Sequence, residues 1–138
     1  MFVIEKPKEI HLATWRDMFM KSQKRNNEDC DFDLFWASAL KEDCHAFCAK
    51  NNGEFLGFVV ACLSNTFIEK YIHLEILFVD PNHRKMGVGR ALLNKVEEIS
   101  STLGLNFYVE HVEKTNLIAQ RLLNDYQKID LMIYKKKV

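Results

Sequence analysis

The stretch LFVDPNHRKMGVGRALL, residues 77–93, combines an apolar strand-like end, a basic loop and the start of an amphipathic helix. Gly87 and Gly89 open that helix, where glycine lets the backbone turn tightly and leaves its N–H groups uncovered. Those groups and the positive end of the helix dipole favour a phosphate or pyrophosphate. Three basic side chains add positive charge around them: Arg84, Lys85 and Arg90. The stretch therefore predicts an anion site between a strand and a helix.

Strand and helix patterns alternate on both sides of this loop. Tyr71–Val79 is a dense apolar run, too short for a typical helix, and favours a central strand buried on both faces. Gly87–Leu103 predicts an amphipathic helix that Gly104 ends. Further strands are expected at Phe2–Ile4, His45–Lys50, Glu54–Leu63, Leu105–Val112 and Ile129–Tyr134. Further helices are expected from Pro7 to about Asn26, over Asp33–Leu40 and over Asn116–Tyr126.

This order of elements predicts one α/β domain over residues 1–138. Antiparallel hairpins come first and strand–helix–strand units come last, which indicates a mixed sheet with helices on both faces. A chain of 138 residues is long enough to bury a core without disulfides or a structural metal.

Composition and charge argue against several classes of partner. Hydrophobic residues make up 48% and charged residues 28%, and 19 Lys and Arg balance 19 Asp and Glu. A neutral molecule has no long-range attraction for nucleic acid or anionic lipid, so neither partner is expected. The first apolar run stops at Glu5, too early for a secretory signal, and no stretch approaches the ~18 apolar residues of a membrane span. We therefore expect a cytoplasmic protein.

The four cysteines are expected to be reduced, partly buried thiols. Cys44 and Cys48 lie on an expected strand, where positions four apart are roughly 13 Å from each other. That separation is too large for two ligands of one zinc ion, so no metal site is expected.

Three phosphate-loop patterns compete for residues 84–93. A Walker loop requires Gly-x-x-x-x-Gly-Lys followed by Ser or Thr, which is absent. A dinucleotide-binding fingerprint, Gly-x-Gly-x-x-Gly or Ala, requires Gly or Ala at the position of Leu92, which argues against it. Glu110 argues for it, because it falls where a ribose-binding acid is expected. The third pattern is [Arg/Gln]-x-x-Gly-x-[Gly/Ala]. Arg84, Gly87 and Gly89 match its three fixed positions. With the preceding Leu-Phe-Val-Asp-Pro, the segment resembles the CoA-binding motif of the GNAT superfamily of N-acyltransferases.

The resemblance implies a mostly antiparallel sheet of six to seven strands and acetyl-CoA as the cosubstrate. Leu77, Phe78 and Val79 would pair through their backbone with the pantetheine arm. The loop would hold the pyrophosphate with residues Arg84, Lys85, Met86, Gly87, Val88, Gly89 and Arg90. Asn116 and Ala119 match a second motif, Asn-x-x-Ala, in which Asn116 either contacts the cosubstrate or simply caps a helix.

Acyl transfer to an amine needs a base, and Glu75 is the expected one. A carboxylate in an apolar strand calls for a reason, and family members often carry a Glu at this place that works through water. His73 lies on the same strand face and either pairs with Glu75 or takes part in the chemistry. The Tyr that serves as the family's acid is replaced by Leu123, so Tyr126, about one helical turn away, is the candidate to stand in for it.

The resulting hypothesis is an N-acetyltransferase that acts on a primary amine of a small molecule or peptide by direct attack. The acidic run at residues 28–33 either favours a cationic acceptor or is a solvated loop. Because the family's acid is missing, an alternative is a non-catalytic module that binds acetyl-CoA and acts on a protein partner. A nucleotide-binding oxidoreductase is a third reading. The protein is expected as a monomer or a homodimer.

Overall fold

The structure is a computed structural model that describes residues 2–23, 31–112 and 114–137. The expected end of the first helix at Asn26 and residues 28–30 of the acidic run, Cys30 included, lie outside the described residues. Within the described ranges, no helix is long and apolar enough to cross a membrane.

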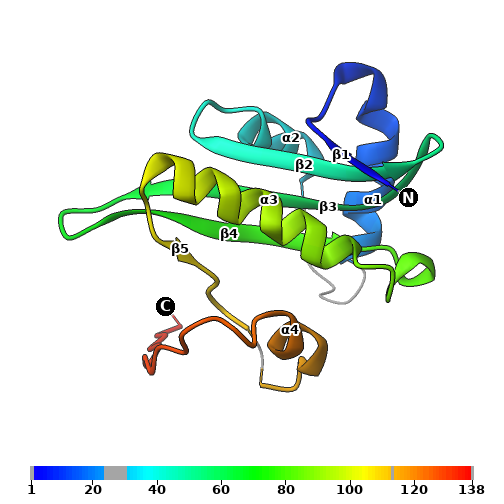
Figure 1. The fold of residues 1–138 in the computed structure, drawn as a ribbon. Helices are drawn as coiled ribbons and strands as arrows, with labels where there is room; N and C mark the ends of the chain where they lie inside the picture. Colours follow the sequence, from blue (N-terminus) through cyan, green and yellow to red (C-terminus); the bar gives the residue numbers. More distant parts are fainter. Residues whose placement is uncertain (1, 24–30, 113, 138) are drawn as a thin grey trace.

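In the described part of the chain, five strands form one sheet in the order β1-β2-β3-β4-β5 (Figure 1). The pairs from β1 to β4 are antiparallel, and β5 lies parallel to β4. The strand bounds are Val3–Glu5 for β1, Cys44–Asn51 for β2, Glu54–Asn65 for β3, Lys70–Val79 for β4 and Phe107–Tyr108 for β5. The expected hairpin between β2 and β3 is confirmed, with Asn52 and Gly53 at positive φ in its turn.

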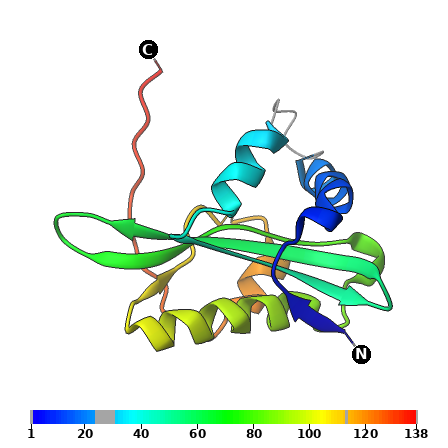
Figure 2. The same ribbon diagram turned by 90° about the horizontal axis from the view of Figure 1, so that it is seen from above.

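Helices cover both faces of the sheet (Figure 2). A short 3-10 turn at Glu9–His11 leads into α1, Leu12–Gln23, and α1 and α2, Phe32–Ala39, lie on one face. The long helix α3, Val88–Leu103, lies on the other face, and α4, Leu117–Leu122, lies beside the start of α3. A second 3-10 turn, Pro81–His83, connects β4 to the glycine loop.

Each face of the sheet has its own core. Under α1 and α2 the core is aromatic, with Trp15, Phe32 and Phe58 almost completely buried. Under α3 it is aliphatic, and Val88, Leu92 and Val96 recur at helical spacing against the sheet. This two-layer burial holds β4 between the helices, so its position is determined by both cores.

Local signals explain where two of the helices start and stop. The Asp31 carboxylate accepts hydrogen bonds from the N–H groups of Asp33 and Leu34 at 3.0 and 3.3 Å, which caps α2. Gly104 has a φ of +68° at the end of α3, a left-handed conformation that glycine adopts without steric cost. Both boundaries agree with the sequence prediction.

Two expectations about the sheet are wrong. The described sheet has five strands rather than six to seven, because residues 129–134 pair with no described strand and β5 contains only two residues. Both faces of β4 pack on a core, but the strand is less buried than expected, since Ile72 is its only fully buried side chain and Glu75 is exposed. The apolar pattern of these segments predicted extended backbone, but partners for an extended backbone come from the tertiary fold.

Cys44 and Cys62 form a disulfide, which corrects the expectation of reduced thiols at these positions. The antiparallel register of β2 and β3 places the two residues directly opposite each other, with their Cα atoms 4.1 Å apart. Cys48 is a free thiol, buried on the aromatic side of the sheet. Burial raises the pKa of the Cys48 thiol to about 12.

Candidate active site

A β-bulge places Glu75 midway along β4. Val60 of β3 pairs with Ile76, but the next residue, Ala61, pairs with Leu74, so Glu75 is the extra residue. A bulge bends its strand and redirects the bulged side chain. The Glu75 side chain is consequently 51% exposed, which explains how a carboxylate is accommodated within an otherwise apolar strand.

The outer edge of β4 is free beyond this bulge. The parallel partner β5 pairs with β4 only at Ile72 and His73, opposite Phe107 and Tyr108. From Leu74 to Val79 no described strand covers that edge. Its outward-facing N–H and C=O groups, apart from the Val79 carbonyl that accepts from Arg84, are available to another extended chain. Leu77, Phe78 and Val79, the residues expected to pair with a pantetheine arm, all lie on this free edge and are half-buried.

The glycine loop is held to the end of β4 by an anchored aspartate. The Asp80 N–H donates to the Leu56 carbonyl at 2.8 Å, and its buried carboxylate accepts from the Asn82 N–H at 3.0 Å and from Lys21 Nζ at 3.1 Å. Burial alone would raise the pKa of Asp80, but these hydrogen bonds and the Lys21 charge outweigh burial and lower it. The loop therefore starts from a fixed point between the sheet and α1.

Gly87 caps the N-terminus of α3 in the left-handed region, with a φ of +79°. It is exposed and has no side chain to accept the first helical N–H groups. The first helical hydrogen bond runs from the Ala91 N–H to the Gly87 carbonyl, so the N–H groups of Val88, Gly89 and Arg90 precede the intrahelical ladder. This is the arrangement that binds a phosphate or pyrophosphate.

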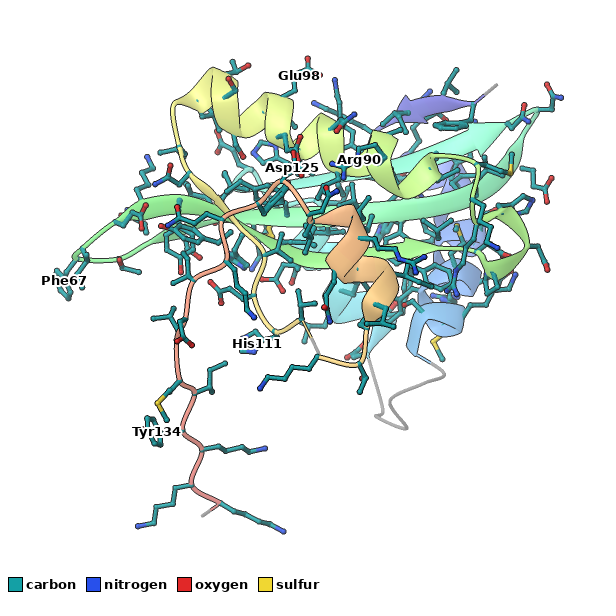
Figure 3. The ribbon with its side chains drawn as sticks, turned by 60° about the horizontal axis from the view of Figure 1, so that its bottom comes forward. Phe67, Arg90, Glu98, His111, Asp125 and Tyr134 are labelled. Atoms are coloured by element: carbon teal, nitrogen blue, oxygen red, sulfur yellow. A yellow bond between two sulfur atoms is a disulfide. The ribbon has the colours of Figure 1, made fainter. Side chains whose placement is uncertain are left out.

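The basic side chains of the loop have two kinds of position. Arg84 donates through Nε to the Val79 carbonyl at 3.3 Å, and the Arg90 guanidinium donates to the Leu122 carbonyl of α4 (Figure 3). Arg84 and Arg90 therefore brace the loop against β4 and α4. Lys85, at a φ of +65°, and Met86 are exposed beside Gly87.

His73 and Glu75 contact each other, as the sequence suggested. The His73 Nε2 atom is hydrogen-bonded to the Glu75 carboxylate, and Nδ1 lies 2.7 Å from Ser64 Oγ on β3. Ser64 lies on the same face of β3 as Phe58 and Val60, the face that packs on α1 and α2. A chain of three polar groups thus extends across two strands beside the aromatic core.

An acidic and aromatic cluster continues this polar face toward β5. The Glu69 carboxylate accepts from the Tyr108 hydroxyl at 2.9 Å and from Asn106 Nδ2 at 2.9 Å. Tyr71 packs against Tyr108 with ring centroids 4.8 Å apart. The hydrogen bond to Glu69 raises the pKa of Tyr108. Sequence reasoning missed this cluster, although Tyr71, like His73, interrupts the apolar run of β4 at a spacing of two.

Tyr126 and Asn116 have other partners. The Tyr126 hydroxyl donates to the Glu97 carboxylate of α3, and its ring packs on Phe107 with centroids 6.1 Å apart. Burial, with this hydrogen bond, raises the pKa of Tyr126 well above its usual value. Asn116 accepts the Ala119 N–H at 3.1 Å and so caps α4. Among the described residues, the structure brings His73 and Glu75 together but joins neither to Tyr126.

Comparison with known proteins identifies the family of the chain. The profile described as Acetyltransferase (GNAT) family matches residues 12–126, which is most of the chain. No curated protein sequence matched. The chain therefore belongs to the acetyltransferase (GNAT) family, which uses acetyl-CoA, and by class it is an N-acetyltransferase.

Solved structures of low sequence identity share the fold. The structure of AAC(6')-Iy in complex with the bisubstrate analog CoA-S-monomethyl-acetylneamine is 20% identical with a TM-score of 0.77, covering 100% of this chain and 99% of that one. A ribosomal-protein-alanine N-acetyltransferase from Brucella melitensis is 14% identical with a TM-score of 0.79, covering 99% of each chain. The aminoglycoside acetyltransferase meta-AAC0020 from an uncultured soil metagenomic sample, in complex with sisomicin, is 15% identical with a TM-score of 0.77, covering 99% and 97%.

Proposed function

We propose that this protein transfers an acetyl group from acetyl-CoA to a primary amine of a small, cationic molecule or of a peptide. The observation that carries the proposal is the arrangement along β4. The strand β4 presents a bulged carboxylate at Glu75 and a free backbone edge at 77–79, and the loop that follows leads to the open N-terminus of α3. Acyl transfer from CoA needs a base, a site for the thioester and a site for the pyrophosphate. In this proposal the carboxylate, the free edge and the helix N-terminus meet these three needs in that order.

The backbone of this chain supplies the cosubstrate site. The N–H groups of residues 87–90 hold the pyrophosphate, with Lys85 adding charge from its exposed position. The free edge at 77–79 pairs with the pantetheine amides as an added strand would. An N–H group near Leu77 then donates to the thioester oxygen as negative charge grows on it in the tetrahedral intermediate. Asn116 completes the site only through its free amide N–H groups, because its oxygen caps α4.

Glu75 acts as the base in this proposal. An attacking ammonium must lose a proton before its lone pair can bond to the carbonyl carbon, and the half-exposed carboxylate takes that proton through water. His73 holds the carboxylate in place, and Ser64 fixes the His73 ring from the other side. Because the Tyr126 hydroxyl is engaged by Glu97, the departing thiolate takes its proton from water or from the product ammonium.

A cationic acceptor suits the polar face beside Glu75. Glu69, Tyr71 and Tyr108 combine one carboxylate with two aromatic rings on the side of the sheet where the base lies. Carboxylates and aromatic rings both attract ammonium groups. Of the acidic run, Asp31 caps α2 and Asp33 pairs with Arg16 at 3.4 Å, so these two are already engaged. One of the similar structures is an aminoglycoside acetyltransferase in complex with sisomicin, and another, AAC(6')-Iy, holds the bisubstrate analog CoA-S-monomethyl-acetylneamine. These two structures support a small amine of this class as the acceptor.

The first test separates cosubstrate binding from turnover. Thermal unfolding is measured with excess acetyl-CoA, CoA, NAD or ATP, since a ligand at a hundred times its Kd adds about 2.7 kcal/mol of stability. Only the CoA compounds should raise the Tm. A panel of primary amines is then screened by detecting the released thiol, and stabilisation without turnover on any amine would point to a binding module.

The second test concerns the base. Glu75→Gln should leave the stabilisation by acetyl-CoA unchanged and lower kcat by about 10²- to 10⁴-fold at neutral pH. Its rate should climb as the pH approaches the amine pKa of about 10.4, because the acceptor then loses its proton without help. Glu98→Gln, an exposed carboxylate on α3, is the matched control and should behave as wild type. A Glu75→Gln enzyme with wild-type kcat at neutral pH would remove Glu75 from the mechanism.

A further inference from the structure

The disulfide between Cys44 and Cys62 lies on the face of the sheet that carries the proposed base. Cys62 packs against the aromatic core under α1 and α2, on the same side of β3 as Phe58 and Val60. The β2–β3 register places Cys44 directly opposite Cys62, and the β3–β4 register places His73 directly opposite Cys62 on the other side. The disulfide and the His73 side chain are therefore neighbours on one face of three adjacent strands.

The contact between Cys62 and His73 joins the disulfide to the polar chain of the site. Directly opposite side chains have Cβ atoms about 4.5–5.5 Å apart. Ser64, two residues beyond Cys62 on the same face, is hydrogen-bonded to His73, which in turn contacts Glu75. The bulge interrupts the β3–β4 ladder just beside this pair. A covalent bond at Cys62 therefore restrains β3 at the point where its pairing with β4 is weakest.

The other end of the bond restrains the connection between α2 and β2. Cys44 is the first residue of β2, and α2 packs on this strand (Figure 1). The Cys44 N–H donates to the Lys41 carbonyl at 3.1 Å, and the Leu63 N–H donates to the Asp43 carbonyl at 2.8 Å. Without the disulfide, these hydrogen bonds and side-chain packing alone hold the end of α2 to the sheet. The bond thus fixes two parts of the acceptor side at once.

A reductant can reach the disulfide from the side of Cys44. Both cysteines are half-buried, and Cys44 lines a cavity of about 280 Å³ between residues 6–7, residues 39–42 and the start of β2. Among the acidic and strongly basic side chains of its wall, Lys6 and Lys41 outnumber Glu42. This excess of positive charge favours the thiolate, which is the form of a thiol that attacks a disulfide.

The buried thiol Cys48 takes no part in such an exchange. It lies four positions after Cys44 on β2, roughly 13 Å away along the strand. Burial raises the pKa of Cys48 to about 12, so it supplies almost no thiolate to attack the bond. Among the described cysteines, breaking and reforming the disulfide therefore return the same pair.

We propose that the Cys44–Cys62 disulfide is a redox-sensitive switch on the acceptor half of the site, and that its reduction by a small thiol lowers turnover. With the bond formed, Cys62 is held against His73, and His73 holds the Glu75 carboxylate. With the bond broken, β3 and the end of α2 move more freely and the base is less well aligned. The inference rests on the proposed function, since it describes a regulation of the same site.

The exchange proceeds in two balanced steps. A thiolate attacks the Cys44 sulfur, the S–S bond breaks, and Cys62 leaves as a thiolate that takes a proton from water. A second thiolate attacks the reductant's sulfur in the mixed disulfide and releases Cys44, which is protonated in turn. Two thiols of the reductant are oxidised to one disulfide, and the disulfide of the protein is reduced to two thiols.

The cosubstrate half of the site lies outside the reach of the switch. In an extended strand, His73 and Val79 are roughly 20 Å apart, and the glycine loop begins only after Val79. Asp80 anchors that loop through the Leu56 carbonyl and through Lys21 of α1, away from the disulfide. Reduction should therefore change the kinetics of the amine and leave the binding of acetyl-CoA unchanged.

A redox titration of the wild type tests this separation. The protein is equilibrated at set ratios of dithiothreitol to its oxidised form, the free thiols are alkylated, and the state of Cys44 and Cys62 is read by peptide mass spectrometry. The acetylated amine is quantified by chromatography, because the reductant is itself a thiol. As the bond is reduced, kcat/KM for the amine should fall about 10- to 100-fold. The Kd of acetyl-CoA, measured by calorimetry below the Tm of the reduced form, should stay the same.

The variant Cys44→Ser separates the bond from local contacts with the base. Cys44 lies across β3 from His73, so it acts on that side chain only through the disulfide. Under oxidising conditions the variant should have the kcat/KM of the reduced wild type, and dithiothreitol should not change it further. The matched control Cys48→Ala removes a thiol from the same strand and should keep the full response. A Cys44→Ser enzyme as active as the oxidised wild type would overturn the proposal.

Three results on the wild type would also overturn the switch. They are a disulfide that does not form in air, a kcat/KM that is equal in both redox states, and a loss of acetyl-CoA affinity that accompanies the loss of turnover. The last result would show general loosening of the fold. Turnover by the oxidised wild type supports the proposed function in each of these cases, so the two failures are distinguishable.

An NMR measurement decides the inference without turnover. If no amine is acetylated in either state, the proposed function fails, and the imidazole signals of His73 are compared in the oxidised and reduced protein. These signals should shift on reduction, because the contacts of His73 with Ser64 and Glu75 are loosened. Unchanged His73 signals would show that the disulfide does not act on the site.

Discussion

The two glycines of the cosubstrate loop should respond to the same substitution with opposite signs. Gly87 has a φ of +79° and no atom within 4 Å of an added Cβ, so the whole cost of Gly87→Ala comes from the left-handed backbone, about 1–2 kcal/mol. Gly89 lies inside α3, and its added Cβ would meet Val79 Cγ2 at 3.6 Å and Leu122 Cδ2 at 3.8 Å, ordinary contact distances. Gly89→Ala should therefore stabilise the protein by up to about 1 kcal/mol through helix propensity.

The assay is chemical and thermal unfolding of both variants beside the wild type. A difference of about 2–3 kcal/mol between the variants corresponds to roughly 5–10 °C in Tm for a domain of this size. Gly87→Ala should also reduce the stabilisation by CoA, because a shift in the Gly87 backbone redirects the N–H groups of residues 88–90. Equal stabilities for the two variants would refute the argument that backbone conformation, and not space, requires glycine at 87.

Three further predictions concern the scaffold around the site. Gly57→Ala should destabilise the protein by about 1–3 kcal/mol, because the added Cβ would lie 2.5 Å from the Phe78 carbonyl oxygen on the neighbouring strand. A Gly57→Ala variant with the wild-type Tm would contradict the close approach of β3 and β4. Asp80 has a lowered pKa, so the stability that its carboxylate contributes is present above the ordinary carboxyl value of 3.8 and is lost as the pH falls below it. Asp80→Asn should be about 1–2 kcal/mol less stable than the wild type at pH 7. The variant should also lose less stability than the wild type on acidification, as measured by urea unfolding from pH 7 to pH 3. Cys48, with a pKa of about 12, should resist a thiol reagent at pH 8 in the folded protein and react on unfolding; rapid modification of the native thiol would show that it is accessible.

Much of the fold was predictable because its signals are local. The Asn-Gly turn between β2 and β3, the Asp31 cap, the stripe of α3 and the glycine that ends it each act within a few residues. The glycine loop was predictable for the same reason, since a phosphate site at a helix N-terminus is made of consecutive residues. His73 and Glu75 were found because polar side chains stand out in an apolar strand.

Features that depend on distant partners could not be predicted in the same way. Ser64, Glu69 and Tyr108 join the site from other strands or strand ends, and no spacing in the sequence connects them to His73 or Tyr71. The assignment of Tyr126 near the chemistry assumed one helical turn of displacement, but α4 ends at Leu122 and the hydroxyl donates to Glu97. Register likewise decided that Cys44 faces Cys62.

The sequence by itself determined the type and order of most elements, the anion-binding loop and two of the polar residues beside it, because propensities, caps and glycine conformations are set by neighbours in the chain. Only the tertiary structure decided the bulge that exposes Glu75, the free edge of β4 and the absence of a described partner for residues 129–134. The physical reason is that strand pairing joins residues far apart in sequence, so the same apolar, extended segment is a core strand, an open edge or an uncovered segment according to what lies beside it.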